Sequence, residues 1–211
     1  LSRRETWSDL GRIVGDDRQF RWFVAARALT QLPLMTVAFL TVYGVDRFHM
    51  TAAHAGALTA LLTAGQALGS LAAGSVGDRF GHRWAMAFGV TVATLAAGVA
   101  AGAPVLAWLA PAFALAGAGA AALWTSPLAL SLTYGDDGSK PAYIALSNTL
   151  VAPFTLVAPL LGGLLADGLG YRAMFSVASA GGIATLAVLV LLVREPTVPA
   201  PVRAVESQRA T

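Results

Sequence analysis

Apolar residues occur along this chain in long continuous runs that are bounded by charged residues or by Gly and Pro. The interval between Arg83 and Asp136 holds no charged residue, and it is far longer than the about 20 apolar residues that one membrane-spanning helix requires. It therefore holds two spans, and Gly102 and Pro104 mark the break between them. In all, the pattern predicts six spans, at about 23–44, 53–76, 84–102, 105–133, 142–166 and 172–193.

These spans are predicted to be α-helices. The runs are continuous and rich in Ala and Leu, whereas a membrane β-strand alternates polar and apolar residues over about ten positions. A bilayer offers no hydrogen-bond partners, and a helix satisfies its own backbone there. The composition agrees, since 56% of the residues are apolar and 12% are charged, against about 25% charged in soluble domains. The predicted fold is an all-α membrane protein with six transmembrane helices.

Both ends of the chain are more polar than the spans between them. Residues 1–21 carry apolar side chains at helical spacing, which predicts a cytoplasmic amphipathic linker; a plain solvated linker is the alternative. Residues 194–211 carry Pro and charged residues and are predicted to be a disordered cytoplasmic tail. The six-helix bundle is expected to occupy residues 22–193.

Positive charge is distributed unequally about the six spans. Of the 14 Lys and Arg residues, only Arg47 and Arg172 lie on one side, and the others share the side that holds both termini. By the positive-inside rule the termini are cytoplasmic, and we expect an integral multi-pass protein of a bacterial plasma membrane. The net charge of +3 follows from this topology and implies no nucleic-acid partner. The chain has no Cys, and no metal site or cofactor is expected.

The junction of the second and third spans carries the most informative motif. It reads Gly-x-x-x-Asp-Arg-x-Gly-x-Arg and consists of Gly74, Asp78, Arg79, Gly81 and Arg83. It resembles the cytoplasmic signature loop of the major facilitator superfamily of secondary transporters, which joins the second and third helices of a six-helix half. The resemblance implies a gating latch that holds one half against the other in the outward-facing state. His82 stands where that family more often has Arg, which lowers the charge of the latch.

The residue types of this motif also have a local logic. Asp78 is expected to cap or face a helix N-terminus, and Gly81 is expected to permit a tight turn. Arg79 and Arg83 would then remain at the anionic inner surface of the membrane. The alternative interpretation is an ordinary turn on the positively charged side.

The same motif occurs again in weaker form. Shifting the sequence by 89 residues, which is 163 minus 74, aligns it with Gly163, Asp167, Gly170 and Arg172. The shift carries the second-to-third junction onto the fifth-to-sixth, and an odd number of helices therefore separates the two copies. The sequence thus predicts an inverted repeat of three plus three helices, which is the plan of each half of the resembled family. A chance match in a Gly-rich chain is the alternative.

Polar side chains are shared unequally among the spans. The first, second, fourth and fifth carry amides or other polar groups, whereas the third and sixth carry no amide or charge. In a membrane, polar groups face protein or a water-filled cavity. We therefore expect the first two helices of each triplet to line a cavity, and the third and sixth to face lipid. The candidate cavity residues are Arg27, Gln31, Gln66, Trp124 and Asn148.

Each candidate has a second interpretation. Gln31 and Gln66 lie near the middle of their spans, where carriers hold substrate, but interhelical hydrogen bonding would equally explain such amides. Arg27 shares a helix face with Gln31, and we favour extension of its side chain toward the inner interface over a role in an anion-accepting wall. Trp124 is either an aromatic cavity wall or an interfacial anchor.

The resembled family usually combines two six-helix halves, with substrate between them. The chain is expected to be one half. The C-terminal half is favoured because the basic entry resembles a central linker, and the N-terminal half is the alternative. The expected function is transmembrane transport of a small solute by alternating access. Residues 158–163 partly resemble an antiporter motif of the family, which leaves an efflux direction open, although helix packing explains this run more simply.

A non-transporting membrane interaction or regulatory subunit is the alternative function. An enzyme is not expected, because the sequence lacks the His-Glu-x-x-His and Gly-x-Ser-x-Gly motifs and places no acidic pair within a span. The expected partners are a small-molecule solute, the lipid bilayer and a second six-helix half, supplied by the same protein or by another chain.

Overall fold

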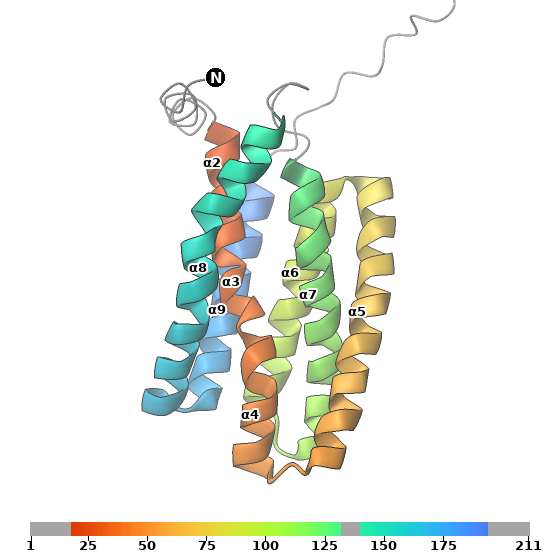
Figure 1. Ribbon diagram of the computed structural model, residues 1–211, viewed down its shortest axis with the longest axis vertical. Coiled ribbons are helices and arrows are strands. Elements are labelled where there is room, and N and C mark those ends of the chain that lie inside the picture. The colour runs from red at the N-terminus through yellow and green to blue at the C-terminus, as the bar shows by residue number, and fades with distance from the viewer. Residues whose placement is uncertain (1–17, 132–139, 194–211) are drawn as a thin grey trace, which may run out of the picture.

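The computed structural model describes residues 18–131 and 140–193. Its elements are α2 (Arg18–Leu29), α3 (Gln31–Leu34), α4 (Thr36–Phe48), α5 (Ala52–Phe80), α6 (His82–Gly102), the short 3-10 helix η1 (Leu106–Trp108), α7 (Leu109–Ser131), α8 (Lys140–Leu169) and α9 (Tyr171–Leu191) (Figure 1). These two ranges contain helices and no strand. The predicted disordered tail and all but the last four residues of the predicted linker lie outside the described residues.

The helices form six candidate membrane spans. Each is long and apolar enough to cross a bilayer: Arg18–Phe48, Ala52–Phe80, His82–Gly102, Leu106–Pro127, Pro141–Leu169 and Tyr171–Leu191. The prediction of an all-α fold with six transmembrane helices is therefore confirmed. The first span already begins at Arg18, within the segment that we predicted to be a linker.

The first span is a bent helix made of α2, α3 and α4. Pro33 has no backbone N–H and cannot donate within a helix, which explains the interruption. The flanking residues Thr30 and Met35 keep right-handed helical backbone, and Met35 N–H still donates to the Gln31 carbonyl at 3.0 Å. The span therefore bends without unwinding, as the step between α3 and α4 shows (Figure 1).

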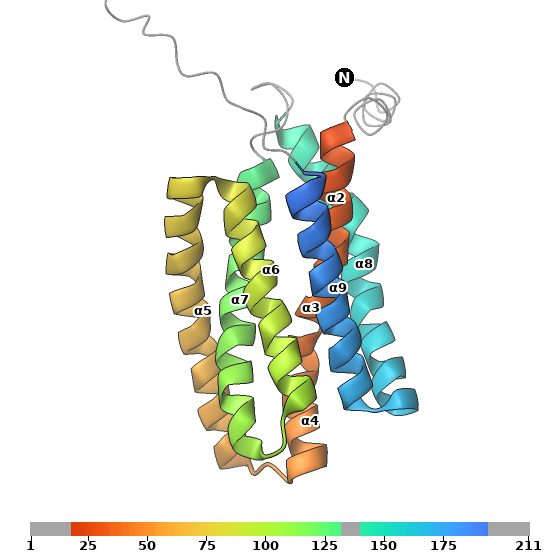
Figure 2. The same ribbon diagram turned by 180° about the vertical axis from the view of Figure 1, so that it is seen from behind.

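The helices form two triplets, and the second and third helices of each triplet pack on the first helix of the other. The first triplet is α2–α4, α5 and α6, and the second is α7, α8 and α9. Helices α5 and α6 both pack on α7, and correspondingly α8 and α9 both pack on the first span. The third helices of the two triplets, α6 and α9, also pack on each other. The first span, α5, α7 and α8 form one face of the bundle (Figure 1), and α6 and α9 form the opposite face (Figure 2).

A single glycine joins the second and third helices of each triplet. Gly81 has φ +96° and ψ 160°, and Gly170 has φ +85° and ψ 161°. Glycine adopts this region at no steric cost, whereas residues with a Cβ are strained there. The two turns lie at the sequence offset of the motif and share one conformation, as an inverted repeat requires. In consequence α5 continues to Phe80 and α8 to Leu169, beyond the predicted ends at 76 and 166.

Helices α5 and α7 approach so closely that backbone meets backbone. A Cβ added to Gly65 would collide with the Ala114 carbonyl oxygen, and one added to Gly117 would collide with the Leu62 carbonyl oxygen. Small residues at a helix interface permit this approach, and the dispersion contacts that result hold helices together in lipid, where a hydrophobic driving force is absent. The buried stripe of α5 consists of Leu58, Gly65, Gly69, Ala73 and Gly77.

Aromatic side chains fill the bundle near both of its ends. At the end where the chain enters, the buried ring of Phe20 meets Tyr143 of α8 edge-on, with 4.9 Å between centroids. At the other end Tyr43 of α4 lies 5.2 Å from Phe175 and 5.3 Å from Tyr171, both on α9. Both clusters join the first span to the second triplet.

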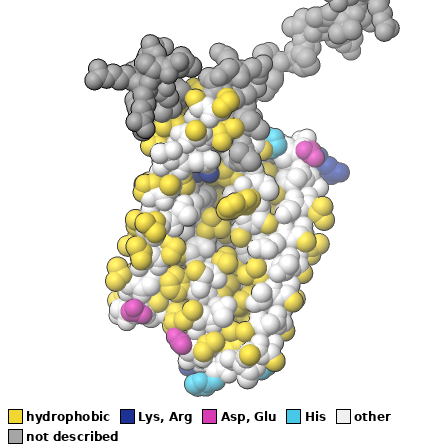
Figure 3. Space-filling view, in the orientation of Figure 1, with side chains coloured by type: hydrophobic (Ala, Val, Ile, Leu, Met, Phe, Trp, Pro, Cys, Tyr) yellow, Lys and Arg dark blue, Asp and Glu magenta, His cyan; other side chains and the backbone are white. Residues whose placement is uncertain are grey.

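The six spans differ in how much of their surface the bundle covers. Within an 18-residue apolar stretch of each span, the share of residues that are buried is 56% in α6, 17% in α5 and 22% in α8. Helix α6 is packed by α5, α7 and α9, and the expectation that the third and sixth spans face lipid stays a prediction. The open surfaces of α5 and α8 carry mostly hydrophobic side chains, and charged side chains lie mainly near the ends of this face (Figure 3).

We expect Gly65→Ala to destabilise the bundle by about 1–3 kcal/mol, the usual cost of overpacking, because α7 would have to move away. Gly56→Ala is the matched control, since Gly56 lies on the same helix with no atom within 4 Å of an added Cβ. Unfolding of both variants in SDS and detergent mixtures would measure the difference. Equal stability of the two variants would contradict the close approach of α5 and α7.

Candidate functional site

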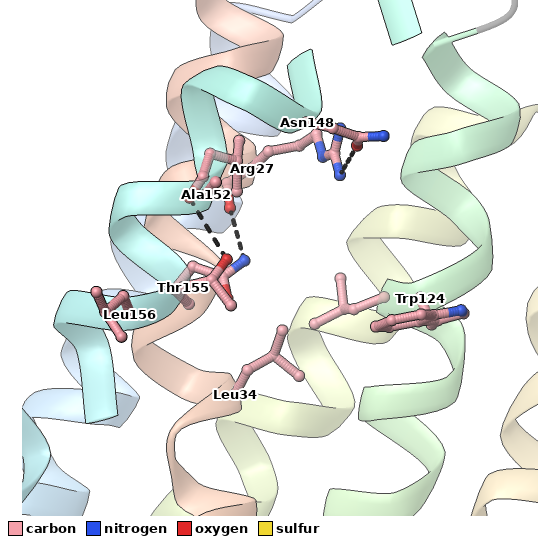
Figure 4. A pocket seen from close by; sticks show the side chains of 10 residues that line it. Arg27, Leu34, Trp124, Asn148, Ala152, Thr155 and Leu156 are labelled. Atoms are coloured by element: carbon pink, nitrogen blue, oxygen red, sulfur yellow. Dashed lines mark hydrogen bonds between the residues drawn. The ribbon is translucent and has the colours of Figure 1, made fainter. Parts of the chain in front are cut away.

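A pocket of about 660 Å³ lies between the first span, α7 and α8. Its polar side chains belong to Arg27, Gln31, Asn148 and Thr155, and its apolar wall includes Leu34, Leu123, Trp124, Val151 and Leu156. In Figure 4 the side chains of Arg27 and Asn148 reach toward each other, and Trp124 lies across the space from them on α7. The pocket therefore combines one cationic corner with a largely apolar wall.

Arg27 is held in place by α8. Its Nη1 donates to the hydroxyl of Ser147 at 2.8 Å, and its Nη2 donates to the Oδ1 of Asn148 at 3.1 Å. The guanidinium also lies 5.9 Å from the ring centre of Phe23, one helical turn back. We favoured extension of the Arg27 side chain toward the membrane interface. This interpretation was wrong, because Ser147 and Asn148 of α8, which is far away in the sequence but adjacent in space, hold the side chain beside the pocket.

Gln31 lies one turn further along the first span and also lines the pocket. Its Nε2 donates to the backbone carbonyl of Arg27 at 3.4 Å, a long bond within the same helix. The amide is half-buried. Gln31 therefore does not join two helices by this bond.

Trp124 provides the wall opposite Arg27. Its side chain is 85% exposed, although α7 as a whole is well packed. A large aromatic ring exposed beside a polar pocket is a surface on which an apolar or aromatic group can pack. Leu34 and Leu123 also line the pocket.

The structure thus brings together four of the five candidate cavity residues, namely Arg27, Gln31, Trp124 and Asn148. Gln66 is separate from them. Gln66 directly follows Gly65, which is buried against α7, but Gln66 itself is exposed on α5 and does not line the pocket. Its backbone carbonyl accepts a bond from Ser70 of the same helix.

Sequence reasoning missed Ser147 and Thr155. Ser147 is fully buried and donates to the Ile144 carbonyl while it accepts from Arg27. Thr155 bonds to the Val151 carbonyl of its own helix and lines the pocket two turns from Asn148. The spacing of Asn148 and Thr155 on one helix was the available signal, because residues seven apart share a face.

The signature motif spans the end of α5 and the start of α6. Gly74, Asp78 and Arg79 lie in the last turns of α5 and are exposed. The N-cap residue of α6 is Gly81, and no side chain caps that helix. The expectation that Asp78 caps a helix was therefore wrong, because α5 extends to Phe80 and carries the carboxylate on its own last turns.

Arg83, in contrast, interacts within the bundle. Its Nη2 donates to the Val190 carbonyl at 2.9 Å, near the end of α9, and its guanidinium lies 5.3 Å from the ring centre of Trp84. The last carbonyls of a helix have no partners in the helix and attract cations. Arg83 thus ties the third helix of the first triplet to the third helix of the second.

The second copy of the motif has a different environment. Gly163 and Asp167 lie on α8, Gly170 forms the turn, and Arg172 is exposed at the second position of α9. The cross-helix bond at this end is made by Tyr171, whose hydroxyl donates to Asp46 Oδ2 at 2.7 Å. The repeat therefore conserves the turn geometry while the polar contacts differ. In the described part of the chain no His, Asp or Glu cluster is suited to hold a metal ion.

Comparisons with known proteins agree with this architecture. Residues 18–211 match the sequence profile of the Major Facilitator Superfamily. A search of curated proteins finds no match. The crystal structure of a mutant of the peptide transporter POT in complex with alafosfalin is similar, with a TM-score of 0.66 at 18% sequence identity. That similarity covers 86% of this chain and 41% of the POT chain.

The fold is thus a six-helix membrane bundle built from an inverted repeat of triplets. Because the profile match covers most of the sequence, the chain belongs to the Major Facilitator Superfamily. The resemblance that the signature motif indicated is confirmed. The chain spans 41% of the length of the similar transporter chain, and that similarity concerns the fold.

The bond between Arg27 and Ser147 predicts energetic coupling between the first span and α8. We expect Arg27→Met and Ser147→Ala to be non-additive in a double-mutant cycle, by about 0.6–1.7 kcal/mol, the range of such bonds in membrane proteins. Arg27→Met with Thr149→Ala is the control, since Thr149 bonds only to the Ala145 carbonyl of its own helix. SDS unfolding would supply the four free energies of each cycle. Additivity in the Ser147 cycle would argue against the observed bond.

Proposed function

We propose that the chain is one six-helix half of a secondary transporter and that it carries a small solute across the membrane by alternating access with a second half. Membership of the superfamily supports this proposal. The observation that carries it is the pocket of Arg27, Gln31, Asn148 and Trp124 on the face formed by the first span, α5, α7 and α8.

The pocket has the properties of a solute site. Its volume of about 660 Å³ lies within the range of about 300–1,000 Å³ that is usual for small-molecule sites. Its polar groups come from helices of both triplets, and Trp124 and Leu156 of its apolar wall are exposed. A second bundle placed against this face would close the pocket and leave the solute between the two halves, as in carriers of this plan.

The open surfaces of α5 and α8 are the proposed contact with the second half. Gly74 supports this assignment, because no atom lies within 4 Å of a Cβ added there. Asp78 follows it by one helical turn and shares its face. We infer that Gly74, Asp78 and Arg79 face the partner half as a gating latch, whereas Gly81 and Arg83 maintain the turn and the packing of this half.

We expect water to reach the pocket and not the opposite face of the bundle. Because the chain has no Cys, Ala152→Cys and Ile183→Cys each provide one thiol. Ala152 lines the pocket, and Ile183 is 62% exposed on α9. Maleimides react with thiolates, which form only in water. In membranes, a hydrophilic maleimide should label Ala152→Cys at least about tenfold faster than Ile183→Cys.

This labelling experiment also separates the two candidate functions. A non-transporting interaction subunit would bury the same face against a partner, and Ala152→Cys would then stay as unreactive as Ile183→Cys in native membranes. Such protection, found in both intact and permeabilised cells, would contradict a solute pathway through the pocket.

We further infer that both termini are cytoplasmic, on the basis of the unequal distribution of Lys and Arg. Ala53 and Arg79 are exposed near opposite ends of α5 and suit a test. In intact cells an impermeant maleimide should label Ala53→Cys, and it should label Arg79→Cys only after permeabilisation. The opposite result would invert the proposed orientation, and equal labelling of both in intact cells would contradict a spanning α5.

A further inference from the structure

We propose that the pocket binds an organic anion, namely a carboxylate joined to an apolar or aromatic body. The carboxylate would lie on the guanidinium of Arg27, and the apolar body would lie against Trp124. This inference rests on the proposed function and adds to it the chemical class of the solute.

The guanidinium of Arg27, the cationic group of the pocket, is already oriented before a solute binds. Ser147 and Asn148 accept one bond each from the two terminal nitrogens of Arg27, and a guanidinium has further N–H donors beyond these two. Both partners are neutral, so they orient the guanidinium without cancelling its charge. An oriented guanidinium with free donors recognises a carboxylate well, because the planar fork matches the two oxygens.

Among the described residues, no carboxylate lines the pocket as a counter-ion for this charge. The acidic residues in the described part of the chain are Asp46, Asp78 and Asp167, and none of them lines the pocket. An uncompensated charge beside apolar surface in a membrane is costly. An anionic solute would remove this cost when it binds, whereas a cationic solute would add to it and a neutral one would leave it unchanged.

The rest of the lining selects for an apolar body. Trp124, Leu34 and Leu156 surround the space that the guanidinium adjoins (Figure 4). The amide of Gln31 and the hydroxyl of Thr155 add neutral polar groups at the edge. A small inorganic anion would leave the apolar wall in contact with water, and a wholly apolar solute would leave Arg27 without a partner.

The test uses the full chain in nanodiscs with two probes of the same shape, 1-naphthylacetate and its neutral amide, 1-naphthylacetamide. The change in tryptophan fluorescence on addition of probe reports binding, and the part of the change that Trp124→Phe removes belongs to the pocket. We expect the carboxylate to bind at least about tenfold more tightly than the amide, which is the usual gain from a charge-assisted hydrogen bond.

Two substitutions assign this preference to Arg27. Arg27→Gln keeps hydrogen-bonding capacity without charge, and it should abolish the preference while the amide keeps its affinity. Arg47→Gln removes the same charge from an exposed position near the end of α4, outside the pocket, and should preserve the preference.

Equal affinity of the two probes for the wild-type chain, or a preference that survives Arg27→Gln, would overturn the anion assignment and leave the solute site intact. Absence of any signal that depends on Trp124, for either probe, would overturn both the anion assignment and the solute site itself.

Discussion

Close contact between α5 and α7 is the constraint on which the rest of this bundle depends. In lipid no hydrophobic force drives helices together, so association relies on dispersion contacts between closely packed backbones. Helix α5 uses Gly65 and Gly69 for this contact, where an added Cβ would collide with Ala114 and Ala118 of α7. The rest of α5 has little to pack against, and its hydrophobic surface stays open on the same face as the pocket. The packing of α5 on α7 thus leaves open the surface that is the proposed contact with a second half.

The inverted repeat explains where the pocket forms. Gly81 and Gly170 reverse the chain in the same way in both triplets, and the second and third helices of each triplet therefore pack on the first helix of the other. The polar contacts do not follow this symmetry. Arg83 binds a helix-end carbonyl at one end, and Tyr171 binds Asp46 at the other. The two turns share a glycine with positive φ, whereas the polar contacts around the turns differ between the two ends of the bundle.

The sequence predicted the positions of the helices better than it predicted which side of each helix packs in the bundle or lines the pocket. Apolar runs and the two glycine turns are local signals, and they identified six helices and the repeat. Nearly every residue of α5 is small or apolar, so periodicity did not indicate that Gly65 faces α7 and that Gln66 lies outside the pocket. The role of Arg27 depends on Ser147, which is 120 residues away. Pairing over such a distance leaves no local pattern in a single sequence.

The bonds of Arg27 also bear on how such a half can move. They join the first span to α8, and Tyr171 with Asp46 joins the same span to α9 near the other end. Pro153 and Pro159 lie within α8, yet the helix is continuous from Lys140 to Leu169. In the proposed transporter, a half that is bonded near both ends and continuous between them would move as one body, by rocking against a second half. The pocket wall would then keep its shape during transport, and access would change at the open face.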